Sequence, residues 1–372
     1  MITFRRLVFL FAILCPSPPF AAESDIVASL YIAYALQGRL NQADRLFSTL
    51  GASTGSSLDR YLAEHFRHRF ILRDENKPPA SDGSFPDQLL YTYQQYWTRS
   101  MMGEFKAPEG TKWLNDELNK LLIIQNDNKS SENSDEIHAA VKRTLERQGV
   151  YSDNSFSSPW YDLVLWKSQE SRPFLIELTD RQLSANVVFM DDFQSLGWSE
   201  FATLGMTSTA GWAAQDALYC VSWAWNHDSE NFRVSFLQHE GRHLADFEQF
   251  PGLHPIDLEY RAKLTELAFA SSTLPRILDK FTDNGNLNPD SPHAYANYRV
   301  VHDLYQMLFD TDMPESGNHW QWARPSEVNP AARTLLDQHT KNLTHQGAVS
   351  TPGIIYRQTL KASPNEVRNA AN

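Results

Sequence analysis

The segment His239-Glu240-Gly241-Arg242-His243 constrains this chain more than any other. It falls within residues 232–250, where apolar side chains recur at the spacing of an α-helix. Residues four apart on a helix lie on one face, one turn apart, so both imidazoles can point at a single metal ion. Zinc favours neutral imidazole nitrogens in a tetrahedral site. The sequence therefore predicts a Zn2+ site with His239 and His243 as ligands, against the alternative of a helix with two unrelated His residues.

Glu240 adds a catalytic element to this pattern. It follows His239 and is offset around the helix, so its carboxylate can reach a metal-bound water rather than the metal. In that place a carboxylate serves as the general base for hydrolysis. A purely structural zinc site does not need such a base. The motif therefore predicts a catalytic site with Glu240 as its base.

A catalytic zinc site needs a third protein ligand. A His six residues after His243 is excluded, because that position is Gln249, and no Gly-Thr-x-x-Asp segment supplies an Asp. A third arrangement draws a Glu from a second helix some twenty residues on. Residues 257–266 form such a helix after a turn at 250–255, and they offer Glu259 and Glu266 on one face. Both remain candidates at this point.

Residues 236–268 resemble the gluzincin superfamily of zinc metallopeptidases. The stretch Glu259-Tyr260-Arg261-Ala262 is similar to the Glu-x-x-Ala ligand helix of that superfamily. The resemblance implies His239, His243 and Glu259 as metal ligands and Glu240 as general base. It favours Glu259 over Glu266 without excluding Glu266.

The sequence departs from this pattern at Lys263. Many gluzincins have an Asp four residues after the ligand Glu, where it orients a zinc-bound His. Lys263 cannot accept a hydrogen bond, so the orienting role passes to another group, Glu266 or Asp246.

Candidates for stabilising an oxyanion lie further along the chain. Metalloproteases use a His, Tyr or Arg beside the metal for this purpose. Residues 291–302 form an expected third helix that begins with Ser-Pro and contains all three residue types. His293 and Tyr298 are the first choices, although either residue can instead be a capping or packing residue.

The N-terminus has the pattern of a secretory signal peptide, residues 1–22. Arg5 and Arg6 precede a short apolar run, and Ala21-Ala22 end the segment. A lipid anchor at Cys15 is not expected, because no small residue stands just before it. Removal of residues 1–22 leaves Cys220 as the one cysteine, so no internal disulfide can form. The sequence therefore predicts a periplasmic or secreted protein.

The net charge limits the possible partners. It is −12 for the whole chain, and loss of the two Arg with the signal peptide makes it −14. An acidic chain repels nucleic acid and anionic membranes. No later apolar run reaches the roughly 18 residues of a membrane helix. We expect no nucleic-acid partner and no integral membrane segment after signal cleavage.

The spacing of apolar residues predicts an α+β fold that is predominantly helical. A helical region is expected at 23–150 and a zincin-like catalytic region with a small sheet at 151–310. Its strands are expected at 174–178, 185–190 and 217–223. A C-terminal extension, irregular with short helices, is expected at 311–372.

Three functions agree with these features. The first is an exported zinc peptidase that acts on peptides or proteins. The second is a zinc hydrolase of another amide or ester that uses the same activated water. The third is a binding protein with a vestigial zinc site. The intact Glu240 argues against the third, whereas the choice between the first two depends on a substrate that the sequence does not reveal.

Overall fold

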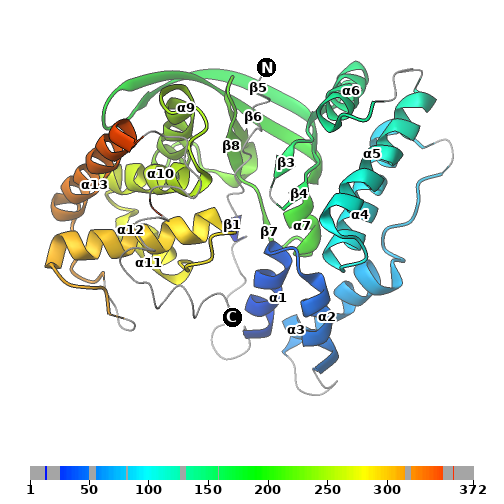
Figure 1. Cartoon of the computed structure of the whole chain (residues 1–372), viewed down its shortest axis with the longest axis horizontal. Coiled ribbons are helices and arrows are strands. Elements are labelled where there is room, and N and C mark those ends of the chain that lie inside the picture. The colour runs from blue at the N-terminus through cyan, green and yellow to red at the C-terminus, as the bar shows by residue number, and fades with distance from the viewer. Residues whose placement is uncertain are drawn as a thin grey trace. The chain divides into compact units, whose positions relative to one another are not determined.

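The computed structural model describes residues 13–14, 26–49, 56–80, 83–125, 131–157, 159–314, 320–346 and 355. The expected signal peptide lies outside these residues except for Ile13–Leu14 (β1), which pair antiparallel with Thr207–Ser208 (β7). The fold is α+β and predominantly helical, which confirms the expected class (Figure 1). No helix in the described ranges combines the length and apolarity that a membrane span requires.

The chain forms two compact units that are not sequential regions. Unit 1 contains Ser171–Val188 and the described residues from Gly211 onward. Unit 2 contains the described residues up to Glu170 together with Phe189–Ala210. The division differs from the regions 23–150, 151–310 and 311–372, because residues 320–346, expected in a separate extension, belong to the unit that contains residues 239–266.

Unit 2 consists mainly of helices, with two small strand pairs and its share of the main sheet. Its helical elements are α1 (Ile26–Leu36), α2 (Leu40–Thr49), α3 (Ser57–Phe66), the π-helical η1 (Arg67–Leu72), α4 (Phe85–Met101), α5 (Ala107–Ile124), α6 (Ser134–Arg147) and α7 (Trp198–Ala202). Its short strands are β1, β2 (Tyr151–Asp153), β3 (Phe156–Ser157), β4 (Trp160–Tyr161) and β7. Aromatic rings fill its core, as in the edge contacts of Phe70 with Phe201 and of Tyr31 with Phe66.

A buried histidine in α6 belongs to this core. His138 stacks on Tyr161 with ring centroids 4.2 Å apart, and its Nδ1 lies 3.1 Å from the Tyr93 hydroxyl. Burial lowers the pKa of His138 from 6.5 to about 4. The ring is therefore neutral in the folded protein at pH values where it is charged in an unfolded chain.

We expect this histidine to reduce stability in acid. Between pH 6.5 and pH 4 the unfolded chain takes up a proton that the folded chain refuses, so the free energy of unfolding falls as the pH falls. A shift of this size corresponds to roughly 3 kcal/mol. Denaturant unfolding across this pH range should show a shallower decline for His138→Gln. The exposed His345→Gln is the control, and an unchanged slope in His138→Gln would contradict the assignment.

The main sheet has the strand order β2-β5-β6-β9-β8. Its long strands are β5 (Val164–Glu177) and β6 (Gln182–Leu196), and both are longer than the expected segments 174–178 and 185–190. The division between the units falls within these two strands. The last strands are β9 (Leu218–Val221), near the third expected strand, and β8 (Gly211–Ala213), which pairs antiparallel with β9.

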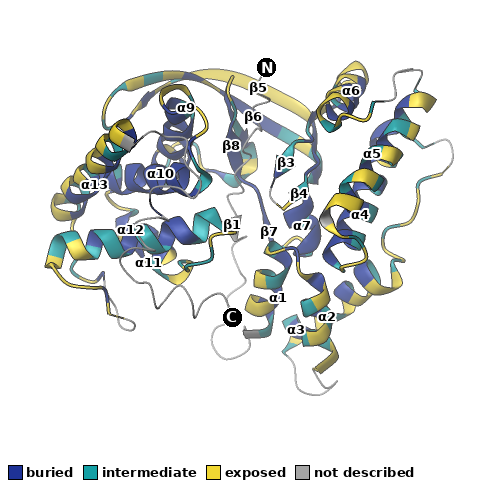
Figure 2. Ribbon diagram, in the orientation of Figure 1, coloured by how far each residue is buried: buried dark blue, intermediate teal, exposed yellow. Residues whose placement is uncertain are grey.

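In unit 1, one helix is buried along its length by the helices around it. Its helical elements are η2 (Ser222–Ala224), α8 (Glu230–Phe232), the π-helical η3 (Arg233–Gln238), α9 (His239–Gln249), α10 (Pro255–Phe269), α11 (Leu274–Asp283), α12 (Pro292–Phe309) and α13 (Pro325–Gln346). Helix α10 packs against α9, α12 and α13 and is buried along its length (Figure 2). Every charged side chain on α10 therefore needs a partner inside the protein.

The C-terminal region is more regular than the sequence suggests. Helix α13 runs for 22 residues, although Pro325 and Pro330 lie in it. Pro325 is at the first position, where a helix has no use for an N–H group, and Pro330 interrupts the bonding only near the start. The helix packs on α10, and the Asn329 and Arg333 side chains donate hydrogen bonds to the α10 carbonyls of Leu267 and Ala268.

Candidate metal centre

The helix with the two histidines is continuous from Glu230 to Gln249, as the sequence predicts for 232–250. The Ser229 hydroxyl caps its start by accepting a hydrogen bond from the Phe232 N–H at 3.1 Å. A π-helical stretch, η3, ends directly before His239, and such wide turns occur often at functional sites. The helix ends before Gly252, whose φ of 80° favours glycine.

The second helix, α10, begins at a strong start signal. His254 Nδ1 accepts a hydrogen bond from the Ile256 N–H at 3.3 Å, and Pro255 takes the first helical position. This start gives Glu259 and Glu266 the seven-residue spacing that turns both carboxylates to one face. Both face α9, as their contacts with its histidines show.

Three side chains from these two helices converge. His239, His243 and Glu259 each offer one atom to a group whose members all lie within 4.8 Å of one another. The two Nε2 atoms are 3.2 Å apart, and Glu259 Oε1 is 3.2 Å from His243 Nε2. All three residues are fully buried. This group is able to hold a metal ion, and it contains the two His and the Glu that the sequence proposes.

Other buried charges near this group make hydrogen bonds, whereas the Glu259 carboxylate has only ion-pair contacts within the described part of the chain, with His243, His293 and Lys263. Arg261 binds Asp246 through two nitrogens at 2.7 and 3.0 Å, and Asp257 lies 3.2 Å from His339 Nε2. Neither oxygen of Glu259 has a hydrogen bond of good geometry among the described residues. A fully buried carboxylate is costly without such bonds. An oxygen and two imidazole nitrogens facing one small space fit the donor set of zinc.

Glu266 has a different role from Glu259. Its Oε1 lies 2.7 Å from His239 Nδ1, a hydrogen bond that fixes the ring and leaves Nε2 turned toward His243. Burial lowers the pKa of His239 to about 4, and this outweighs the opposing effect of Glu266, so the ring is neutral as a metal ligand must be. Of the two residues proposed to orient a zinc-bound His, Glu266 is thus the one that contacts His239. Asp246, the other candidate, is bound to Arg261.

Glu240 is a second buried carboxylate without hydrogen bonds. Neither of its oxygens makes a hydrogen bond of good geometry to the described residues, although the backbone of Ala213 in β8 lies close enough to lower its pKa. Burial raises its pKa to about 8, more than the nearby His243 lowers it. The carboxylate of Glu240 therefore has the high proton affinity that suits a general base.

The next residue, Gly241, lets α9 approach the sheet closely, because a Cβ there would lie 3.0 Å from a methyl carbon of Ile176.

The two residues proposed for the oxyanion lie in different places on α12. His293 Nδ1 is 2.7 Å from Glu259 Oε2, and the side chain is 29% exposed. Tyr298 stacks on His302 with ring centroids 4.0 Å apart. Five residues on a helix turn a side chain to another face, so the two do not point the same way. The structure thus brings His293 to the group and records Tyr298 against His302.

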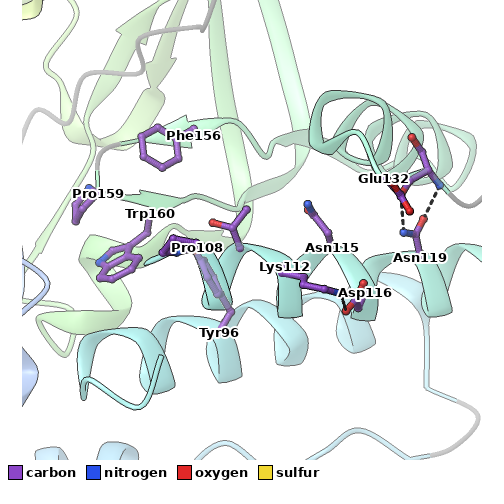
Figure 3. A pocket seen from close by; sticks show the side chains of 12 residues that line it. Tyr96, Pro108, Lys112, Asn115, Asp116, Asn119, Glu132, Phe156, Pro159 and Trp160 are labelled. Carbon is purple, nitrogen blue, oxygen red and sulfur yellow. Dashed lines mark hydrogen bonds and ion pairs between the residues drawn. The ribbon is translucent and has the colours of Figure 1, made fainter. Parts of the chain in front are cut away.

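Unit 2 contains a separate open pocket of about 1010 Å³. Figure 3 shows aromatic and proline side chains at one end and polar groups at the other. Its polar groups are largely paired among themselves, as in Lys112 with Asp116 at 2.8 Å and Asn119 with the Ser131 carbonyl at 2.9 Å. None of the three residues of the metal-binding group lines this pocket, so it adds nothing to the chemistry of unit 1.

Comparison with known proteins gives no relative on which to rest a function: no family model, no curated protein and no solved structure matches the chain.

Proposed function

We propose that this chain is an exported zinc metallohydrolase whose substrates contain peptide bonds. One observation supports the hydrolase above all. The imidazoles of His239 and His243 and the carboxylate of Glu259 meet in a buried space. Glu240, whose buried carboxylate has no hydrogen bond of good geometry among the described residues, directly follows His239. Export rests on the signal-peptide pattern of residues 1–22.

Each residue then has a stated task. Zinc, when bound, supplies a Lewis acid that lowers the pKa of water and polarises a carbonyl. His239, His243 and Glu259 hold the ion, and Glu266 orients His239 through its hydrogen bond to Nδ1. Glu240 accepts the proton of the attacking water on a carboxylate oxygen and later gives it to the leaving group. The assignment of His293 and Tyr298 to the oxyanion stays a prediction from the sequence.

The resemblance to gluzincins favours peptides over other amides and esters. It implies that an extended peptide pairs with a sheet edge beside the metal-binding helix. Strand β8 is the last strand in the sheet order, and it packs next to α9. A zinc hydrolase of a non-peptide amide or ester remains the second candidate, because the same residues serve both reactions.

The purified protein should contain about one zinc per chain, as one three-ligand group predicts. We expect it to cleave a mixed peptide library, scored by mass spectrometry. Treatment with 1,10-phenanthroline should abolish cleavage, and added Zn2+ should restore it. Cleavage of ester or amide reporters but of no peptide would favour the second candidate. Zinc without hydrolysis of either kind would overturn the hydrolase and favour a binding protein.

A further inference from the structure

A buried lysine stands beside the metal-binding group. Lys263 is four residues after Glu259 on α10, so the two side chains share one face. Its side chain is 5% exposed, and Nζ is 3.5 Å from Glu259 Oε2 and 5.0 Å from the centre of the Phe281 ring. The gluzincin pattern has an acid at this position. Here a cation, packed against an aromatic face, adjoins the ligand carboxylate.

The two oxygens of Glu259 have different neighbours. Oε1 is 3.2 Å from His243 Nε2. Oε2 is 2.7 Å from His293 Nδ1 and 3.5 Å from Lys263 Nζ, and it is also the oxygen that faces His239 Nε2, at 3.7 Å. Two possible hydrogen-bond donors therefore lie at Oε2, His293 from α12 and Lys263 from α10 itself.

Lys263 balances the negative charge of the carboxylates in the site. Glu240, Glu259 and Glu266 are three buried carboxylates around two imidazoles. When all three are ionised, a divalent cation leaves one negative charge uncompensated, and Lys263 cancels it. An uncompensated buried charge is costly, so a lysine at this position stabilises the occupied site. An ionised acid in its place would leave the site with two uncompensated negative charges.

We propose that Lys263 and His293 are positioning residues that together hold Oε2 of Glu259, so that Glu259 presents Oε1 alone to the metal. The inference rests on the proposed metal site. When His293 and Lys263 both hold Oε2, the carboxylate is not free to turn and offer both of its oxygens to the metal. Removal of either donor frees Oε2 to become an additional ligand.

Visible absorption of the Co2+-loaded protein tests this proposal, because Co2+ absorbs more weakly as its coordination number rises. At saturating Co2+ and equal occupancy, we expect Lys263→Met and His293→Gln to absorb less than the parent. Lys263→Arg should keep most of the parent intensity. Melting curves identify a variant that fails to fold, and the partly exposed His293 provides the variant that is safer in this respect.

The outcomes separate this inference from the proposed function. Spectra of both variants that superimpose on the parent at full occupancy would overturn the positioning role while leaving the metal site intact. A parent that binds no Co2+ would overturn both. Weakened spectra in a protein that hydrolyses nothing would support the positioning role and count against the hydrolase.

Discussion

Glu240→Gln is expected to keep its metal and lose its hydrolysis. Gln has nearly the shape of Glu but cannot take a proton from water, so binding of the ion by His239, His243 and Glu259 is undisturbed. General-base catalysis contributes about 10²–10⁴-fold, and we expect a loss of that size in kcat/KM. The measurement is the rate on the best peptide found in the library, alongside zinc content.

Glu248→Gln is the matched control for this variant. It makes the same chemical change on the same helix, but Glu248 has a side chain that is 74% exposed, beside Arg181. Its rate and zinc content should equal those of the parent. Hydrolysis by Glu240→Gln at the parent rate would show that Glu240 is not the general base. It would also contradict the interpretation of residues 239–243 as a catalytic motif.

Local patterns in the sequence predicted the parts of the site that lie within single helices. The spacing of His239 and His243 and the start signals before Pro255 are properties of neighbouring residues, and the structure has helices at both places. Glu259 and Glu266 could not be separated in this way, because both lie on one face of α10. Packing against α9 distinguishes them: Glu266 reaches Nδ1 of His239, and Glu259 reaches the side of Nε2.

Contacts between distant segments were beyond the reach of such patterns. The seven-residue spacing on α10 does not show that His293, on α12, comes within 2.7 Å of Glu259. Lys263 was visible as a departure from the gluzincin pattern, and its i,i+4 spacing from Glu259 already placed both on one face. Its part in the site became apparent only with the burial of α10. The division into two units likewise falls inside β5 and β6, where no local signal in the sequence marks it.

Metal titration should distinguish the two glutamates of α10 clearly. Glu259→Ala removes one of three ligands, so we expect it to lose stoichiometric zinc. Glu266→Gln keeps all three ligands and weakens only the support of His239, for which a loss of about 10–100-fold in affinity is typical. Competition with a chromophoric chelator at fixed pH measures both variants against the parent.

Glu248→Ala serves as the control, because it removes an exposed carboxylate from α9 at the end away from His239. It should bind zinc as the parent does. The reverse order of the two α10 variants, with zinc lost in Glu266→Gln and kept in Glu259→Ala, would make Glu266 the ligand. That result would contradict the geometry. Glu266 Oε1 is hydrogen-bonded to Nδ1 of His239, whereas Nε2 of the same ring lies beside His243 Nε2 and faces Glu259. The titration therefore decides whether Glu259, which has no hydrogen bond of good geometry among the described residues, or Glu266, which has one to His239, holds the ion.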